Sequence, residues 1–580
     1  MRAFAHHRPG RPLTGAAALG AAVLAVASAM FAGAPSAQAA PSPSTTLVVS
    51  ADQTLRPVTH VATGSLYGLA NATAPADSLV QAIKPHTFVQ KPQGGRQQPT
   101  GDVLTVAPKA ARAGAKVVNR LSDYYAGWPY QFSWSTWLNV VDDQIAQTRA
   151  SGITNLAAYA PWNESDNTWL SANGTFEDFW TRTYREIRSK DTTTPIQGPS
   201  FSDNISDMDN FLRNAVATNT VPDIIAWHEL TRSSKIAGDV ATVTALEKKY
   251  GISARPIAIE EYAAPAEVGV PGALVGYLAK FERLGVHDAE LAFWNQSGAL
   301  GDLLTGQGGS PNGAYWLYKW YADMSGSMLV TTPPAQTGID GAASRNSAGN
   351  QIDVVFGGGS GDSAVTVNGL GSLSAFGSTV HVKVEYTPSP GRTVAVSGPS
   401  TLSESDYSVS NGSLTVPVTV NSTYGYHIRI TPGSGNGSTL DGSYQITNKN
   451  SGLALDTRNG GTAQGTLVDQ APAGNSATQT WTLVSAGSGL YKIRNQAGGL
   501  LLGITDESTS DGGTALIWGD NGTPDHLWRM VSDGTGYYKI VNYHSNLLLG
   551  VQNMSTADGA PVIQWDDNGT ADHLWKLSRR

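Results

Sequence analysis

Ile257-Ala258-Ile259-Glu260-Glu261-Tyr262 is a short apolar run that ends in two acids and an aromatic residue. Apolar runs of this length, bounded by polar residues, are typical of strands buried on both faces of a parallel sheet. Six candidate strands of this kind lie at residues 115–120, 155–161, 195–200, 224–228, 256–261 and 289–294. Apolar residues recur at helical spacing between them, for example over 137–150 and 271–282. This alternation of strand and helix predicts a parallel sheet.

The length of the region predicts how the sheet closes. Residues 57–326 span about 270 positions, close to the roughly 250 of a (β/α)8 barrel. We therefore assign residues 40–326 to a (β/α)8 TIM barrel. A seventh strand is expected at 65–69. The remaining strand is expected between Arg120 and Asn155, although no apolar run marks its place.

Polar or aromatic residues stand where the predicted strands end, and in this fold those ends face the active site. They are Arg120, Asn163-Glu164, His228, Glu261 and Trp294. A glycosidic bond is cut by two carboxyl groups, one that protonates the leaving oxygen and one that attacks the anomeric carbon or activates water. Glu164 and Glu261 suit these roles. Glu260 is the alternative to Glu261, because adjacent strand residues face opposite ways and one of the two can enter the cleft.

This ordered set of residues resembles clan A glycoside hydrolases, and within that clan family 39. The resemblance implies that Glu164 is the acid/base, with a pKa raised by its pocket, and that Glu261 is the nucleophile, kept ionised by Arg120 and His228. It also implies substrate-binding residues, namely Arg120, Asn163, His228, Tyr262 and Trp294. Family 39 includes β-xylosidases, α-L-iduronidases and arabinogalactan side-chain enzymes, and it pairs the barrel with a β-sandwich.

The resemblance implies a retaining, double-displacement hydrolase acting on plant-type polysaccharide or arabinogalactan side chains, similar to a xylosidase or arabinosidase. The alternative is a non-catalytic carbohydrate-binding protein. Residues 327–431 contain short strands separated by Gly, Ser and Asn turns, which predicts the β-sandwich, and residues 432–440 have the composition of a linker.

The last segment, 441–580, is an internal repeat with a period of 47 residues. The repeated positions are Tyr444, Tyr491 and Tyr538 near the start of each unit, and Trp481, Trp528 and Trp575 at its end. The pattern resembles the ricin-type β-trefoil lectin (carbohydrate-binding module family 13), with the three tryptophans in its core. The chain is thus expected to be multidomain, with a TIM barrel, a β-sandwich and a β-trefoil.

In ricin-type lobes an early Asp and a later aromatic residue bracket a sugar. The resemblance therefore implies sugar-binding residues, namely Asp456, Trp518, Asn521, Trp565 and Asn568. No lobe carries the whole pattern. Gly503 and Gly550 stand at the positions equivalent to Asp456, and the second and third lobes close with His-Leu-Trp instead of Gln-x-Trp.

Residues 1–39 have the features of an export signal. Three arginines precede an apolar run of small residues, and Ala37-Gln38-Ala39 forms a cleavage site. A membrane anchor is the alternative interpretation, but Gly15, Gly20 and Gly33 interrupt the run. We expect a secreted, extracellular protein with no membrane partner.

Composition excludes several classes of function. The net charge of −8 argues against nucleic acid as a partner, since phosphate binding needs a basic face. The chain has no cysteine, which excludes disulfides, thiolate catalysis and Cys-based zinc sites. Its eleven histidines show no metal-binding spacing, and no Gly-rich nucleotide motif follows a strand. We expect no metal and no cofactor, a polysaccharide or oligosaccharide substrate, and a monomer.

Overall fold

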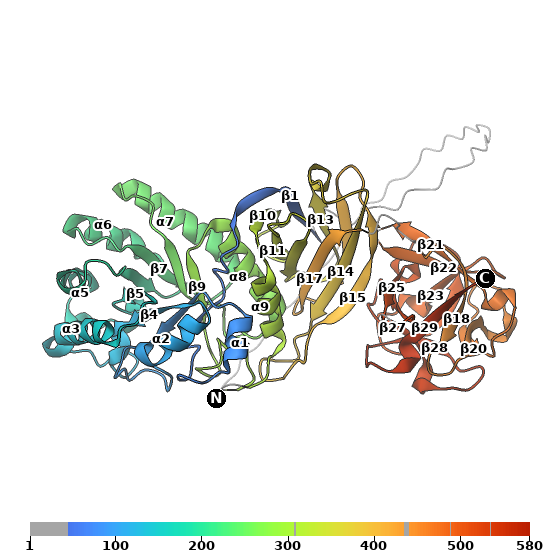
Figure 1. Cartoon of the computed structure of the whole chain (residues 1–580), viewed down its shortest axis with the longest axis horizontal. Helices are drawn as coiled ribbons and strands as arrows, with labels where there is room; N and C mark the ends of the chain where they lie inside the picture. Colours follow the sequence, from blue (N-terminus) through green and yellow to red (C-terminus); the bar gives the residue numbers. More distant parts are fainter. Residues whose placement is uncertain (1–44, 307–308, 434–439, 488, 534) are drawn as a thin grey trace, which may run out of the picture. The chain divides into compact units, whose positions relative to one another are not determined.

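The computed structural model describes residues 45–306, 309–433, 440–487, 489–533 and 535–580. The expected export signal at 1–39 and most of the expected linker at 432–440 lie outside the described residues. None of the described helices is long and apolar enough to cross a membrane. The expected architecture of barrel, β-sandwich and β-trefoil is confirmed (Figure 1).

The barrel is an eight-stranded parallel sheet in the order β5-β4-β3-β2-β9-β8-β7-β6. A parallel bridge between Tyr159 and Ile196 brings its two edge strands, β5 and β6, together, so the sheet is nearly closed. The strands are β2 (Gly64–Leu66), β3 (Thr87–Gln90), β4 (Lys116–Arg120), β5 (Leu156–Ala160), β6 (Gln197–Phe201), β7 (Ile224–Glu229), β8 (Ile257–Tyr262) and β9 (Asp288–Leu291).

The strand that the sequence left unplaced is β3, and it precedes Arg120 instead of following it. The expectation of a strand between Arg120 and Asn155 is therefore wrong, and Arg120 ends the third barrel strand instead of the second. The segment after Arg120 folds into a short 3-10 turn and a long helix. β3 contains two apolar residues, Phe88 and Val89, between Thr87 and Gln90, so no apolar run marks it in the sequence.

Helices follow the strands and cover the outside of the barrel (Figure 1). The described helices are α1 (Asp77–Ala82), α2 (Val103–Arg112), α3 (Trp134–Ser151), α4 (Ser165–Thr168), α5 (Phe176–Lys190), α6 (Met208–Thr218), α7 (Ile236–Tyr250), α8 (Pro271–Leu284) and α9 (Gly313–Asp323). The barrel interior is lined partly by small residues, including Ala158, Ala226 and Ala258. Such residues leave room for the buried acids described below.

The β-sandwich is built from a nine-stranded sheet around its own apolar core. It includes β1 (Thr46–Pro57), which pairs antiparallel with β10 and parallel with β13. The expected barrel segment 40–326 thus contains a strand that belongs to the sandwich, because alternate residues of β1 are buried in the sandwich core. The other strands are β10 (Ser327–Thr332), β11 (Asp340–Arg345), β12 (Ile352–Gly357), β13 (Gly361–Asn368), β14 (Thr379–Thr387), β15 (Ser400–Ser408), β16 (Leu414–Val420) and β17 (Gly425–Pro432).

The C-terminal region repeats one four-strand unit three times. Its closing tryptophans, Trp481, Trp528 and Trp575, are fully buried, as predicted. Each indole nitrogen donates to a backbone oxygen 26 residues earlier, at 2.8–3.0 Å, so the repeat extends to single hydrogen bonds. The strands are β18 (Gly442–Asn448), β19 (Ala454–Thr457), β20 (Val468–Ala471), β21 (Trp481–Gly487), β22 (Leu490–Asn495), β23 (Leu501–Ile504), β24 (Ala515–Trp518), β25 (Trp528–Ser532), β26 (Tyr538–Asn542), β27 (Leu548–Val551), β28 (Val562–Trp565) and β29 (Leu574–Arg579).

Candidate active site

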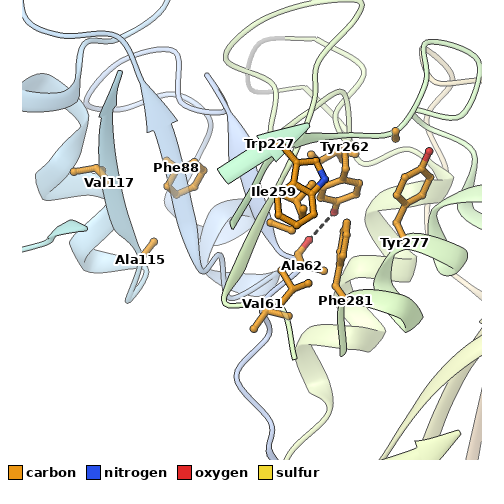
Figure 2. Packing of buried hydrophobic residues seen from close by; sticks show 14 of the residues in the cluster. Val61, Ala62, Phe88, Ala115, Val117, Trp227, Ile259, Tyr262, Tyr277 and Phe281 are labelled. Carbon is orange, nitrogen blue, oxygen red and sulfur yellow. Dashed lines mark hydrogen bonds between the residues drawn. The ribbon is translucent and has the colours of Figure 1, made fainter. Parts of the chain in front are cut away.

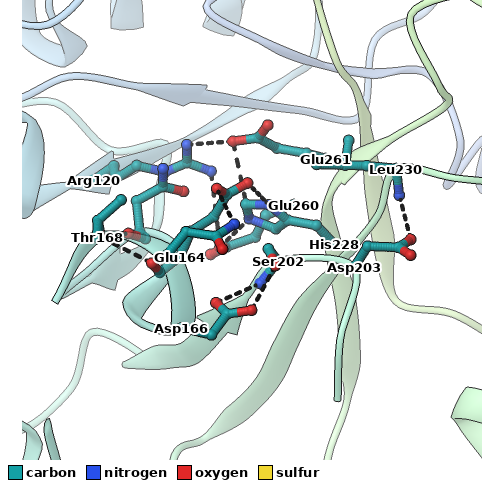
Figure 3. A network of polar contacts seen from close by, with 12 residues as sticks. Arg120, Glu164, Asp166, Thr168, Ser202, Asp203, His228, Leu230, Glu260 and Glu261 are labelled. Carbon is teal, nitrogen blue, oxygen red and sulfur yellow. Dashed lines mark hydrogen bonds and ion pairs between the residues drawn. The ribbon is translucent and has the colours of Figure 1, made fainter. Parts of the chain in front are cut away.

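Glu261 lies near the end of β8, where Arg120 of β4 holds its carboxylate (Figure 3). Nη1 of the buried Arg120 donates to Oε1 of Glu261 at 2.7 Å. The pairing of β8 with β9 is irregular between Ile259 and Tyr262. At this irregularity Glu260 also turns toward Arg120, and its Oε2 lies 3.8 Å from Nη2. The two glutamate side chains therefore do not point to opposite faces of the sheet, as expected for adjacent residues of a regular strand.

Burial distinguishes the two glutamates. Glu261 is 8% exposed and lines a cavity, whereas Glu260 is 0% exposed and does not line it. Oε1 of Glu260 accepts a hydrogen bond from the side chain of Gln197 on β6. A substrate in the cavity can therefore reach Glu261, while Glu260 lies beneath the site.

Glu164 follows β5 and has a backbone φ of +49°, in the left-handed region. A non-glycine residue there carries a cost of order 1–3 kcal/mol, and such residues cluster at active sites. Its amide donates to Ser200 O at 2.8 Å, which fixes the turn. Carboxylate oxygens of Glu164 and Glu261 lie within 4.8 Å of each other. Two carboxyl groups about 5 Å apart match the spacing of retaining glycosidases.

His228 of β7 lies between the carboxylates. Its Nδ1 is 3.0 Å from Oε1 of Glu164, and its Nε2 is 3.7 Å from Glu260 and 3.9 Å from Glu261. We expect from the sequence that His228 bonds Glu261, but its closest contact is Glu164. Together, His228 and Arg120 place two cationic groups among three carboxylates, so this cluster balances most of its charge without a metal ion.

The expected rise in the pKa of Glu164 is wrong. Burial alone would raise the pKa of this carboxyl group, but the hydrogen bond and charge of His228 outweigh burial and lower it below its ordinary value. Burial would lower the pKa of His228, but the charges of Glu261, Glu164 and Glu260 raise it to about 10. These shifts favour a protonated imidazole beside an ionised Glu164 before a substrate binds.

The cavity above these groups has a volume of about 570 Å³, within the usual range for ligand sites. Asn163 and Trp294, both predicted from the sequence, line it. Oδ1 of Asn163 is buried and makes no hydrogen bond to the described residues. Trp294 is 41% exposed, and its indole nitrogen donates to Ala263 O at 3.0 Å.

Sequence reasoning missed several cavity residues that come from loops. Tyr67 follows β2, and Trp128 and Tyr130 follow β4. The hydroxyl groups of Tyr67 and Tyr130 both donate to the buried Asp123. Burial raises the pKa of Asp123 to about 6. Residues 123–132 are rich in aromatic residues, but no periodic pattern in the sequence identifies the rings that reach the cavity.

Tyr262 is not a substrate-binding residue. It is fully buried on the outer side of the barrel, where it packs against Tyr277 and Phe281 (Figure 2). Its hydroxyl donates to Ala62 O at 2.6 Å. The expectation failed because the irregularity in β8 brings Glu260 and Glu261 to one side and turns the next residue outward.

The trefoil carries two similar pockets. Trp565 and Asn568 line one, and Trp518 and Asn521 line the other. Both tryptophans are substantially exposed, at 41% and 37%. The first lobe has Ala471 at the position equivalent to Trp518 and therefore lacks this aromatic surface.

The departures from the lectin pattern have a common steric cause. A Cβ at Gly503 would lie 2.3 Å from Cδ2 of His526, and one at Gly550 would lie 2.1 Å from Cδ2 of His573. In the first lobe Gln479 replaces the histidine and donates to Oδ2 of Asp456 at 2.9 Å. Asp456 is thus already bonded within the lobe, so it is a weaker candidate for sugar binding than the two tryptophan pockets.

Comparisons with known proteins agree with this architecture. N2152 from Neocallimastix frontalis, a solved structure, is 36% identical with a TM-score of 0.65, and the match covers 67% of this chain and 100% of that chain. The chain belongs to the same family as N2152. The Ricin-type beta-trefoil lectin domain-like family matches residues 429–518 and 485–565.

Two curated relatives of this N2152 family member have assigned activities. A 3-O-beta-L-arabinopyranosyl-alpha-L-arabinofuranosidase of Bifidobacterium pseudocatenulatum is 28% identical over 64% of the chain and 46% of the relative. A 3-O-alpha-D-galactosyl-alpha-L-arabinofuranosidase of Bifidobacterium longum subsp. longum is 26% identical over 65% of the chain and 40% of the relative. The chain thus spans less than half the length of these relatives. These matches agree with the expected glycoside hydrolase joined to a ricin-type lectin domain.

Proposed function

We propose that the protein is a secreted, retaining glycoside hydrolase that removes α-L-arabinofuranosyl groups from arabinogalactan side chains. One observation carries the proposal: oxygens of Glu164 and Glu261 lie within 4.8 Å of each other at the floor of a cavity that a sugar can enter. The names of the two curated relatives support arabinofuranose as the cleaved sugar. The features of residues 1–39 support secretion.

The reaction has two steps. Glu164 gives its proton to the leaving oxygen while Glu261 attacks the anomeric carbon, so the glycosidic bond breaks and a glycosyl ester forms. Glu164, now ionised, takes a proton from water, and the water oxygen attacks the same carbon and releases Glu261. Two inversions give net retention. The guanidinium of Arg120 donates to Oε1 of Glu261 and so orients the attacking carboxylate.

His228 is the partner of Glu164 in proton transfer in this proposal. Glu164 must be protonated in the first step and ionised in the second. Nδ1 of His228, 3.0 Å from Oε1 of Glu164, can hold this proton before the substrate binds and pass it to Glu164 for the first step. Asn163 directly precedes Glu164 and lines the cavity, so in this proposal its side chain binds a sugar hydroxyl group during bond cleavage.

The trefoil binds the polysaccharide in this proposal. Trp518 and Trp565 each offer an exposed ring beside an asparagine, which suits the apolar face and hydroxyl groups of a sugar. Two weak sites on one chain raise the local concentration of polymer near the catalytic cavity.

The test uses three variants and one stereochemical measurement. Wild type, Glu261→Gln, Glu164→Gln and the matched variant Glu260→Gln are assayed on aryl α-L-arabinofuranosides, aryl β-xylosides and arabinogalactan, and the first-formed product anomer is followed by NMR. We expect release of arabinose-containing product with retention, and a loss of at least ~10⁴-fold in Glu261→Gln that far exceeds the loss in Glu260→Gln.

Other outcomes reject specific parts of the proposal. An inverted product would contradict the two-step mechanism. A larger loss of activity in Glu260→Gln than in Glu261→Gln would assign the role of nucleophile to Glu260. Polysaccharide binding without hydrolysis of any glycoside would favour the non-catalytic carbohydrate-binding protein.

A further inference from the structure

Trp128 exposes 56% of its surface while lining the catalytic cavity. It lies in the loop between β4 and α3. Burial of an indole ring away from water is favourable, so an exposed ring in a fixed position beside an active site is well suited to bind a ligand. The proposed reaction as described above does not use this ring.

Neighbouring residues hold the loop of Trp128 in place. The ring of Tyr130 lies 5.8 Å from that of Trp128, and its hydroxyl donates to Oδ1 of Asp123 at 2.8 Å. From the loop after β3, Nε2 of Gln97 donates to Gly127 O at 2.7 Å and to Tyr125 O at 3.2 Å. The ring of Trp128 is therefore braced before any ligand binds, which limits the entropy lost on binding.

The two exposed tryptophans of the cavity are anchored to different catalytic segments. Tyr130, which supports Trp128, packs on Trp162 with a centroid distance of 5.1 Å, and Trp162 lies two residues before Glu164. Trp294 instead donates to the backbone oxygen of Ala263, two residues after Glu261. Trp128 thus belongs to the acid/base side of the cavity and Trp294 to the nucleophile side.

The chemistry of a retaining hydrolase gives these sides different ligands. The acid/base protonates the oxygen of the leaving group, so the leaving group lies beside Glu164. The nucleophile attacks the sugar that stays on the enzyme, from the opposite face. A ring on the Glu164 side therefore contacts the leaving group.

We propose that Trp128 is the stacking platform for a leaving-group sugar, so that the enzyme is built to cleave bonds to a carbohydrate chain. This inference rests on the proposed hydrolase function and extends it to the second half of the substrate. The class of ligand is a pyranose ring that presents an apolar C–H face, as a polysaccharide backbone does. Trp128 is then a specificity-determining residue that favours sugar leaving groups over others.

The test compares two substrates that differ in the leaving group. Kinetic constants are measured for wild type, Trp128→Ala and Trp128→Phe on p-nitrophenyl α-L-arabinofuranoside and on an arabinosyl-bearing galactan oligosaccharide. We expect the ratio of kcat/KM on the oligosaccharide to kcat/KM on the aryl substrate to fall about tenfold or more in Trp128→Ala, because stacking is lost. Trp128→Phe retains a ring and should restore most of the ratio.

A transfer assay measures the same subsite directly. With the aryl donor and added galactobiose, the ratio of glycosyl transfer to hydrolysis should fall in Trp128→Ala, because the acceptor occupies the place of the leaving group. Melting temperatures of the variants verify folding. Equal losses on both substrates, or no change in either ratio, would overturn the assignment of Trp128.

Failure of the proposed hydrolase function can be distinguished from failure of the proposal for Trp128. If wild type cleaves no arabinofuranoside, the hydrolase proposal fails. Trp128 is then tested in the Glu164→Gln protein by fluorescence titration with the same galactan oligosaccharide. Weaker binding after Trp128→Ala would support stacking of a sugar ring on Trp128, and equal binding would reject it.

Discussion

Nδ1 of His228 lies 3.0 Å from Oε1 of Glu164, so the proposed acid/base is bonded to an imidazole that has no access to solvent. We treat the two groups as one titrating unit, which supplies a proton in the first step of the proposed reaction and regains one in the second. Glu260, Glu261 and Arg120 are the charged groups around this pair. The carboxylates favour the charged imidazole and the guanidinium opposes it.

Replacing His228 by Gln should move the alkaline limb of the kcat/KM profile to lower pH. Neighbouring carboxylates raise the pKa of His228 to about 10, so the pair keeps its proton well above neutral pH, and Glu164 alone would lose it earlier. The measurement is the pH dependence of kcat/KM on an aryl arabinofuranoside. His381→Gln, at a partly exposed histidine of the sandwich, is the control. An unchanged limb in His228→Gln would contradict proton sharing.

Replacing Glu290 by Gln should stabilise the protein more at pH 8 than at pH 5. Both carboxylate oxygens of Glu290 are buried without a hydrogen bond to the described residues. Burial, with Asp288 and Glu260 nearby, raises the pKa of Glu290 far above its ordinary value. The folded protein therefore loses stability as pH rises from about 4 toward that raised pKa.

Glutamine removes this loss because it does not titrate. We expect a gain of about 1–3 kcal/mol at pH 8, measured as a rise in Tm. Glu507→Gln, at an exposed residue of the trefoil, serves as the control. Equal shifts at both pH values would show that Glu290 is not a buried, strained acid.

Replacing Tyr262 by Phe should lower stability and leave KM near the wild-type value. The hydroxyl of Tyr262 bonds to Ala62 O and Tyr318, so its loss should cost about 1 kcal/mol. Thermal unfolding and steady-state kinetics are the two measurements. Tyr67→Phe is the contrasting variant, since Tyr67 lines the cavity and should change kinetics. A large rise in KM for Tyr262→Phe would show that Tyr262 contributes to substrate binding.

Replacing Trp518 and Trp565 by Ala together should abolish most polysaccharide binding by the trefoil. Each single variant should weaken binding by about tenfold or less, because the other pocket remains. Binding to arabinogalactan is measured by affinity electrophoresis. Val484→Ala, an exposed apolar residue of β21, is the matched control. Full binding by the double variant would place the sugar sites elsewhere.

The repeat and the strand ends made much of this molecule predictable from sequence. The 47-residue period identified Trp481, Trp528 and Trp575 as core residues, and the strand ends brought Arg120, Glu164 and Glu261 together. These features depend on periodicity and on the topology of the barrel, which a sequence records directly.

Other features depend on local geometry that the sequence does not record. The irregularity in β8 sends Tyr262 outward and gives Glu260 and Glu261 a common side, against the alternation of an ideal strand. Trp128 reaches the cavity from a loop without a periodic pattern. The sequence predicts a raised pKa for Glu164, whereas the structure lowers it. The hydrogen bond to His228 that causes this shift joins residues 64 positions apart, so no local pattern reveals it.

The close fit between Gly503 and His526, and between Gly550 and His573, constrains how these lobes can change by mutation. A lobe that ends in His-Leu-Trp has no room for an aspartate at the glycine, so that substitution alone would force the histidine out of place. A lobe that ends in Gln-x-Trp accommodates the aspartate, as Asp456 and Gln479 show. To convert a glycine–histidine lobe into an aspartate–glutamine lobe, the histidine must therefore change first, through a glycine–glutamine intermediate.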